Sequence, residues 1–252
     1  MAEENPMDPI HQFVIKPIVS LHPLGIDASF TNASLFMVIV VLAAAALMLL
    51  GTQPKALVPG RLQSLAEVAY QFVASTVHMA GGHDGMRFFP FVFTLFLFVL
   101  FCNLIGLLPY TFSITSQIMV TAALAMLVIG IVVVYGLIHN GNGFLKLFVP
   151  SGVPILLMPL LVPIEIISFL SRPVSLSVRL FANMLAGHIT LQVMGGFVVS
   201  LLGAGLFSVL APLPFAMTIV LTAFELLVAV LQAYVFAILT CVYLNDAVHP
   251  GH

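Results

Sequence analysis

The chain has 252 residues, of which 62% are hydrophobic and 6% are charged, and its formal net charge is −2. Soluble domains carry about 25% charged residues, so this composition excludes a globular enzyme and predicts an integral membrane protein. The sequence contains no basic tract that would bind nucleic acid. Its recurring apolar runs of about 20 residues favour an all-α fold over a β-barrel.

Composition divides the chain into two parts. Residues 1–30 are polar and interrupted by proline and glycine, so we expect an N-terminal surface segment there. This segment lacks the basic start and early apolar run of a cleavable signal peptide. Residues 31–252 are expected to form a single helical transmembrane domain.

The first half of the apolar region contains three predicted membrane-crossing helices. Residues 33–50 are just long enough for the first, and residues 88–108 and 117–138 are predicted as the second and third. Between them, residues 62–79 place apolar and polar side chains on different faces of a helix. That pattern predicts an amphipathic helix that lies in the membrane interface rather than crossing it.

The second half contains two longer apolar segments. Residues 154–202 would span about 73 Å as one helix, against a hydrocarbon core of about 30 Å. Hydropathy leaves two interpretations open: two crossing helices that break near Arg172 and Pro173, or one steeply tilted helix. Residues 214–244 are predicted as a final long helix, which gives about five crossing helices in all.

Positive residues beside short loops predict the orientation in the membrane. Lys55, Arg61, Arg87 and Lys146 flank the two loops that share one side, and we expect that side to be cytoplasmic. The acidic N-terminus is then expected outside. If residues 154–202 cross once, the C-terminus is cytoplasmic.

The polar residues inside the long apolar segment are the strongest functional signal. A charged residue at bilayer depth costs roughly 2.5–3.5 kcal/mol, so such residues predict an ion or substrate path. At about 100° per residue, one helical face carries Glu165, Ser168, Arg172, Ser175, Arg179 and Asn183. His188 and Gln192 share roughly the opposite face.

These residues differ in what they can do with a proton. A guanidinium is not deprotonated in proteins, so Arg179 is a fixed counter-charge rather than a proton relay. It would hold a passing carboxylate in its ionised form. Glu165, His188 and Glu225 can each bind and release protons. Gln232 lies seven residues after Glu225 and shares its face of the final helix.

The remaining candidate ligands carry no metal signal. Cys102 and Cys241 lie within apolar runs and are interpreted as small buried residues. His78, His83 and His139 show no ligand spacing. We therefore expect no metal site and no cofactor.

Three stretches resemble subunit a of the F-type ATP synthase. The run SRPVSLSVRLFANMLAGH at residues 171–188 resembles the signature of that family. Residues 231–244 resemble its C-terminal helix, and residues 101–109 resemble its third helical segment. The resemblance covers most of the chain after residue 33.

The resemblance implies a non-catalytic, proton-translocating stator subunit of the Fo sector within the whole F-type ATP synthase. Its implied partners are the rotating c-ring of subunit c, the stator subunit b and membrane lipid. Its implied location is an energy-transducing membrane, and a bacterial inner membrane is favoured over a mitochondrial one. The family's last two helices form a long tilted hairpin, which favours a single helix over residues 154–202.

The resemblance also implies roles for six residues. They are Arg179 as the arginine that faces the ring carboxylates, Asn183 and Gln232 beside it as path-lining or positioning residues, Glu165 at the inner half-channel, and His188 and Glu225 at the outer half-channel.

Some polar residues also have purely structural interpretations. Glu165 would alternatively pair with Arg172, and Gln232 would form a helix–helix hydrogen bond. Arg172 lies next to Pro173, and this position favours a structural contact or a contact with the membrane interface for its side chain. Asp246 is expected as a surface residue at a helix end.

Two other classes of function compete with a stator subunit. A self-contained transporter or proton channel would need an alternating-access element or a pore of its own, and the sequence has no visible internal repeat. A membrane scaffold would not explain a buried arginine without a partner in its own turn. The choice between H⁺ and Na⁺ as the transported ion stays open.

Overall fold

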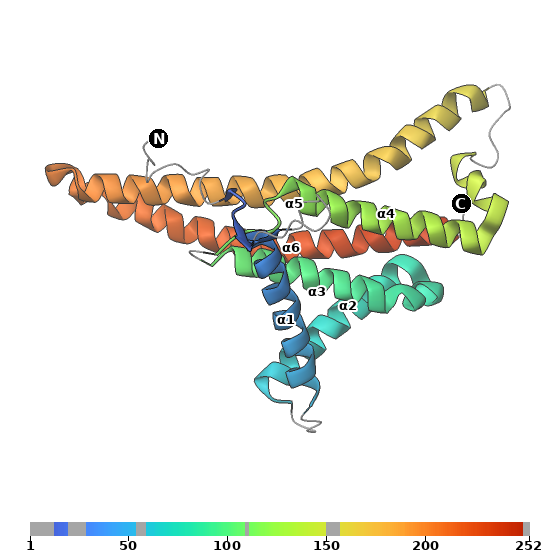
Figure 1. Ribbon diagram of the computed structural model, residues 1–252, viewed down its shortest axis with the longest axis horizontal. Coiled ribbons are helices and arrows are strands. Elements are labelled where there is room, and N and C mark those ends of the chain that lie inside the picture. The colour runs from blue at the N-terminus through green and yellow to red at the C-terminus, as the bar shows by residue number, and fades with distance from the viewer. Residues whose placement is uncertain (1–12, 20–28, 54–58, 109–110, 150–156, 249–252) are drawn as a thin grey trace.

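The computed structural model describes residues 13–19, 29–53, 59–108, 111–149 and 157–248, and these are almost entirely helical (Figure 1). The long helices, in chain order, are α1 (Asn32–Thr52), α2 (Arg61–Gly85), α3 (Phe89–Gly106), α4 (Ile118–Asn140), α5 (Met158–Leu202) and α6 (Pro212–Val248). Two short antiparallel strands, β1 (Pro17–Val19) and β2 (Phe30–Thr31), precede α1. Most of the predicted surface segment, residues 1–30, lies outside the described residues.

Local sequence explains where several helices begin. Thr31 caps α1 by accepting a hydrogen bond from the backbone nitrogen of Ser34, at 3.3 Å. Proline occupies the first turns of α3 and α5 and is the first residue of α6. A proline there loses no helical hydrogen bond, because the first backbone N–H groups of a helix have no partner.

The predicted all-α membrane architecture is confirmed. Within the described residues, five helical segments are long and apolar enough to cross a membrane. They are Asn32–Thr52, Met86–Gly106, Ile118–Asn140, Met158–Leu202 and Phe207–Val248. The shorter ones match the three crossing helices predicted from the first half of the chain.

α2 corresponds to the predicted amphipathic helix, and it continues past residue 79 through a bend. Gly82 adopts φ 58°, a conformation that glycine reaches without steric cost. Val73 and Val77 are buried against neighbouring helices, whereas Leu65 and Val68 are more than half exposed. Part of the apolar face of α2 therefore packs against other helices of the chain, and part of it is exposed. Its interfacial position stays a prediction.

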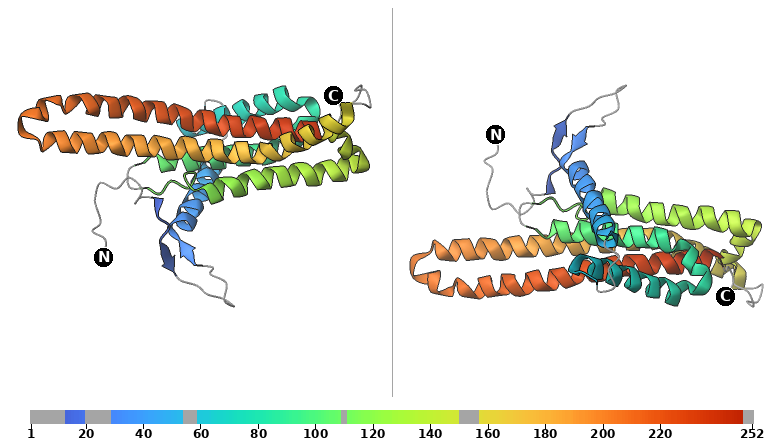
Figure 2. Two further views of the ribbon diagram at one scale, coloured as in Figure 1. Left: turned by 90° about the horizontal axis from the view of Figure 1, so that it is seen from above. Right: turned by 90° about the horizontal axis from the view of Figure 1, so that it is seen from below.

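α5 and α6 form one long hairpin, with the 3₁₀ helix η6 (Gly205–Leu210) at its turn (Figure 2). The 45 residues of α5 correspond to about 67 Å, roughly twice the hydrocarbon thickness. One continuous helix therefore replaces the two-helix alternative. Pro163 and Pro173 lie inside α5, and α5 changes direction partway along its length (Figure 1).

α6 is the centre of the packing and contacts α2, α3, α4 and α5. Ala229, Ala233 and Ala237 recur every fourth residue along it and are almost completely buried. Small residues at this spacing let neighbouring backbones approach closely, as is usual between membrane helices. Phe236 and Leu244 fill the same interior.

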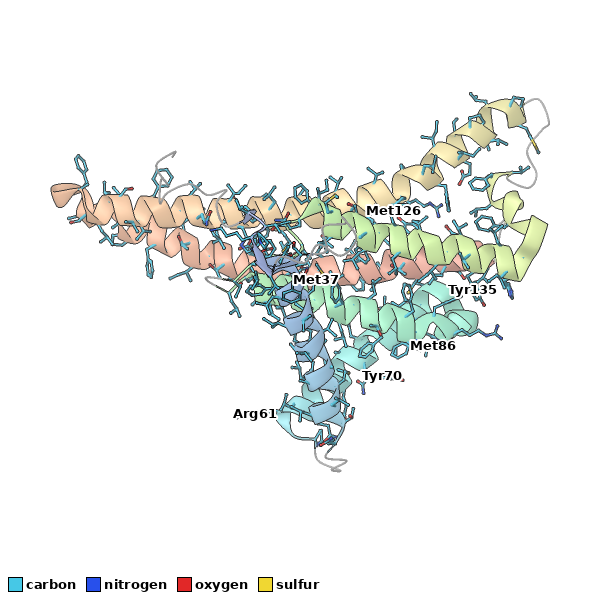
Figure 3. The ribbon with its side chains drawn as sticks, viewed as in Figure 1. Met37, Arg61, Tyr70, Met86, Met126 and Tyr135 are labelled. Atoms are coloured by element: carbon cyan, nitrogen blue, oxygen red, sulfur yellow. The ribbon has the colours of Figure 1, made fainter. Side chains whose placement is uncertain are left out.

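α1 points away from the α5–α6 hairpin at a steep angle (Figures 1 and 2) and packs against α2 and α3. Most of its surface is unburied within the described structure. Its far end meets the start of α2, where Arg61 lies well away from the hairpin (Figure 3). The hairpin and the helices packed on it therefore carry the candidate site.

Candidate functional site

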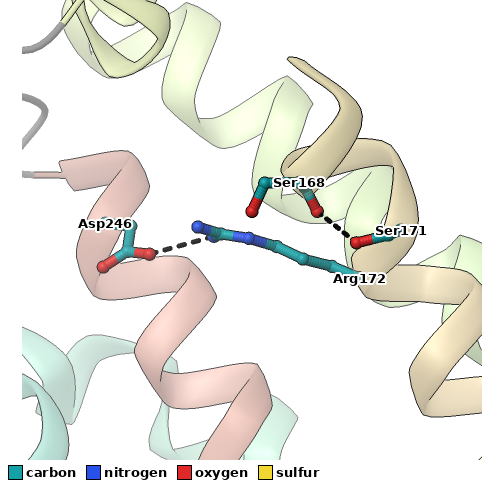
Figure 4. A network of polar contacts seen from close by, with 4 residues as sticks. All are labelled: Ser168, Ser171, Arg172 and Asp246. Atoms are coloured by element: carbon teal, nitrogen blue, oxygen red, sulfur yellow. Dashed lines mark hydrogen bonds and ion pairs between the residues drawn. The ribbon is translucent and has the colours of Figure 1, made fainter. Parts of the chain in front are cut away.

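Arg172, on α5, is paired with Asp246, near the end of α6 (Figure 4). Arg172 Nη1 lies 2.9 Å from Asp246 Oδ2. The guanidinium also lies 4.9 Å from the ring centroid of Tyr243 and 5.6 Å from that of Phe169. The alternative pairing of Arg172 with Glu165 is therefore wrong. Asp246 lies near the end of α6 and is 33% exposed, as expected of a surface residue at a helix end, but its carboxylate also joins the two helices of the hairpin.

Arg179 lies two turns further along the same stripe and is placed differently. Its side chain is exposed, and its hydrogen bond within the described structure is a long one of 3.4 Å to Ser175 Oγ on the preceding turn. No carboxylate whose side chain is described lies within ion-pairing distance of it. Arg179 therefore presents a permanent positive charge on the outside of the hairpin.

Asn183 and Gln232 are brought together across the hairpin. Asn183 Nδ2 donates to Gln232 Oε1 at 2.9 Å. Gln232 is 4% exposed, and its own amide nitrogen has no partner among the described residues. Asn183 is exposed one turn after Arg179. The helix–helix interpretation of Gln232 is confirmed, and the hydrogen bond lies next to the unpaired arginine.

Glu225 packs directly against α5 at Gly187, the residue before His188. A side-chain carbon added to Gly187 would collide with the Glu225 carboxyl group. Glu225 is 4% exposed, and neither of its carboxyl oxygens has a hydrogen-bond partner among the described residues. His188 is 9% exposed, and its Nε2 also lacks a partner there. Because buried polar atoms are normally satisfied, these three atoms point to water or protons at this place.

A cavity of about 730 Å³ opens beside His188. Its polar lining comes from five helices or segments: Lys16 before β1, Asn32 on α1, Thr111 and Ser113 after α3, His188 and Gln192 on α5, and Thr218 and Thr222 on α6. The volume exceeds many times the roughly 30 Å³ share of one water molecule. Water can therefore reach the imidazole of His188.

Glu165 lies fourteen residues before Arg179, toward the N-terminal end of α5, whereas His188 lies on the C-terminal side of Arg179. It is half-buried, and the described residues offer it neither a hydrogen bond nor an ion pair. The structure thus joins Asn183 to Gln232 and places Glu225 next to His188. It leaves Glu165 and Arg179 without an acidic or basic partner of their own chain among the described side chains.

Two buried polar residues extend this arrangement beyond the predicted set. Asn103, on α3, donates from Nδ2 to the carbonyl of Ala229 at 3.2 Å, and its Oδ1 has no partner in the described structure. Ser113 is buried after α3 with an equally unpartnered hydroxyl. Asn103 sits in an apolar run, and such a residue is the sequence signal for a buried polar contact. Ser113 carries no comparable signal.

The described residues contain no group of three His, Cys, Asp or Glu side chains placed to hold a metal ion. Cys102 and Cys241 are both buried and free, as their apolar surroundings in the sequence predict.

Comparison with known proteins gives one consistent result. A family model described as ATP synthase A chain matches residues 34–245. The chain is 66% identical to the ATP synthase subunit a of Beijerinckia indica over 253 residues, with both chains covered completely. It is 62% identical to the ATP synthase subunit a of Mesorhizobium japonicum over 98% of each chain. A protein of the same name from a Chelativorans species is 63% identical over 97% of this chain and 99% of its own.

Proposed function

The chain belongs to the family of ATP synthase subunit a, and from this premise we propose that it forms the proton path of the Fo stator. It is a multi-pass protein of the bacterial inner membrane, like its relatives. In the proposal, two offset aqueous half-channels meet at Arg179, which faces carboxylates of a rotating ring of subunit c. Proton flow through this chain turns the ring, and ATP forms elsewhere in the complex.

The contrast between the two arginines of α5 carries the proposal. Arg172 has a carboxylate of its own chain at 2.9 Å, whereas Arg179 has none among the described side chains and lies exposed. An unpaired charge at bilayer depth is costly and marks a functional site. Its missing anion is then one brought by another protein, which is what a ring carboxylate would supply.

The outer half-channel is the path from the cavity to His188 and Glu225. The cavity admits water, His188 lines it, and the Glu225 carboxyl lies against Gly187, the preceding residue of α5, without a hydrogen bond among the described residues. A histidine that lines a water-accessible cavity and a buried carboxylic acid packed behind it can pass a proton inward one step at a time. The proton then reaches a ring carboxylate beyond Gln232.

The inner half-channel passes Glu165. This residue lies near the N-terminal end of α5, which begins at Met158, and its carboxylate has no partner among the described residues. The positive residues Arg61 and Arg87 lie beside short loops on the side of the membrane where α5 begins, and they support a cytoplasmic location for that side. The N-terminus is then outside and the C-terminus cytoplasmic. Stator subunit b is proposed as a further neighbour.

The cycle follows from the charge states. A ring carboxylate that takes a proton from the outer path becomes neutral and can turn into lipid, where an ion could not. A ring carboxyl group that the rotation has carried through most of one turn of the ring loses its proton toward Glu165. It then meets Arg179 as an anion. The guanidinium keeps the two water paths apart, because a proton cannot pass through a fixed cation. Each proton crossing 100 mV contributes about 2.3 kcal/mol.

The test compares conservative changes at the two arginines in the whole ATP synthase, reconstituted into vesicles with an imposed proton gradient. Arg179→Lys is expected to abolish gradient-driven ATP synthesis, because an ammonium does not reproduce the planar fork of guanidinium. Arg172→Lys is the matched control, since a lysine can still pair with Asp246, and most synthesis should remain. Substantial synthesis by both Arg179→Lys and Arg179→Ala would refute the proposal.

A further inference from the structure

The segment Phe13–Val19, which we name the strap, lies along the cavity that leads to His188. Val14 and Lys16 of the strap line this cavity together with His188 and Gln192. The strap belongs to the predicted N-terminal surface segment, residues 1–30. Its position instead makes it one wall of the water-filled space.

Two polar side chains at the starts of different helices hold the strap. Gln117, just before α4, donates from Nε2 to the Phe13 carbonyl at 2.8 Å and makes no capping bond to its own helix. Asn32, the first residue of α1, donates from Nδ2 to the Val14 carbonyl at 3.2 Å. Asn32 also exchanges backbone and side-chain hydrogen bonds with Lys16, each at 3.1 Å. The strap is thus held at three residues: Phe13, Val14 and Lys16.

The first residue of the strap reaches the imidazole itself. The ring of Phe13 lies edge-on to His188, with ring centroids 6.2 Å apart and planes at 72°. Edge-to-face geometry is a favoured arrangement for two aromatic rings. His188 Nε2 has no hydrogen-bond partner among the described residues, so the contact with Phe13 is one of the packing contacts that orient the ring.

We propose that the strap is the outer wall of the His188 cavity and that Phe13 is a positioning residue, which holds the imidazole in the orientation that receives protons from that cavity. The inference rests on the proposed proton path. It assigns to the N-terminal segment a direct part in proton uptake: one face of the strap meets the cavity water, and its first side chain orients the first group to bind the proton.

The wall is tested by thiol accessibility in the intact ATP synthase. Thr218 lines the cavity from α6 and is only partly exposed, so Thr218→Cys supplies a target for a small alkylating reagent, while Cys102 and Cys241 are buried. Gln117→Leu removes a hydrogen bond from the strap, and alkylation at position 218 should become about fivefold faster. Gln71→Leu, a change at an exposed glutamine of α2, is the matched control. Equal alkylation rates in all three backgrounds would overturn the wall.

The positioning role is tested by gradient-driven ATP synthesis in vesicles. Phe13→Leu keeps an apolar side chain but removes the ring and should lower synthesis several-fold, whereas Phe13→Tyr should restore it. Phe36→Leu is the matched control, because Phe36 lines the same cavity but its ring contacts Phe112, with centroids 6.4 Å apart. Equal effects of Phe13→Leu and Phe36→Leu would overturn the positioning role.

These outcomes are separable from those for the proton path. Alkylation at position 218 reports the location of the strap, whatever Arg179 does. If Arg179→Lys and Arg179→Ala both support synthesis while the strap variants behave as expected, the proposed path fails and the wall stands. If Arg179→Lys abolishes synthesis and the strap variants match their controls, only the inference about the strap fails.

Discussion

The Asn183 side chain donates to Gln232 Oε1 at 2.9 Å and so links α5 to α6 one turn beyond Arg179. The acceptor is buried, whereas the donor lies at the surface of the hairpin. This hydrogen bond ties the exposed stripe that carries Arg179 to the interior of the chain. It restricts how far the two helices can shift at the level of the proposed ring contact.

Removing the hydrogen bond from either side should therefore have the same result. Asn183→Leu and Gln232→Leu are each expected to reduce gradient-driven ATP synthesis several-fold, since a hydrogen bond of this kind contributes about 1 kcal/mol. The double variant should be little worse than either single variant, because both changes remove one interaction. Strictly multiplicative losses in the three variants would show that the two residues act separately.

The Arg172–Asp246 pair should act on stability more than on proton flow. Asp246→Ala leaves the guanidinium of Arg172, a side chain that is 18% exposed, without its carboxylate, which costs about 1–3 kcal/mol. The expected outcome is a lower thermal midpoint of the detergent-solubilised complex. Asn245→Ala changes the adjacent residue and serves as the control. An unchanged midpoint in Asp246→Ala would show that the ion pair contributes nothing to the hairpin.

Gly187 should tolerate no larger side chain, because the Glu225 carboxyl group occupies the space that a Cβ would need. Gly187→Ala is expected to displace Glu225, cost about 1–3 kcal/mol and abolish most proton-driven synthesis. Gly195→Ala, in the same helix, is the matched control, since a Cβ there meets nothing within 4 Å.

A compensating change sharpens this prediction. Glu225→Asp shortens the acidic side chain by one methylene, so it should recover part of the synthesis lost in Gly187→Ala. Gly187→Ala with full activity would place Glu225 elsewhere.

Glu225→Gln separates the chemistry of this residue from its packing. The amide has nearly the same shape as the carboxyl group but cannot bind and release a proton. The complex should keep its thermal midpoint, while proton pumping driven by ATP hydrolysis should fall strongly. Thr218→Val, a change in the lining of the same cavity, is the comparison. Pumping at the wild-type rate in Glu225→Gln would remove Glu225 from the outer path.

The sequence predicted the helical part of this architecture well. Apolar runs longer than a bilayer and the 100° stripe with Arg179 follow from local composition and periodicity alone. Residues 154–202 show the limit: hydropathy allowed one helix or two, because a proline such as Pro173 can break a helix or only bend it. The resemblance to a family, rather than periodicity, favoured the single helix that α5 forms.

Partners distant in the sequence were harder to predict. The sequence offered Arg172 an alternative partner in Glu165, two turns away on its own helix, but the carboxylate that pairs with it comes from Asp246, 74 residues later. The position of that partner depends on the length of the hairpin and on the turn near Gly205–Leu210. Neither is encoded in the neighbourhood of Arg172.

The sequence by itself determined that the chain is an integral membrane protein, that its membrane-crossing segments are helical, and that a permanent cation lies on one face of its longest apolar segment. These properties are set by side-chain transfer energies and by the period of the helix, which need no tertiary information. Only the tertiary structure decided which arginine finds an acid, that Glu225 rests on Gly187, and that Phe13 reaches His188. Such contacts join segments that meet only after α5 and α6 pack, because close packing selects partners by shape and distance rather than by position in the chain.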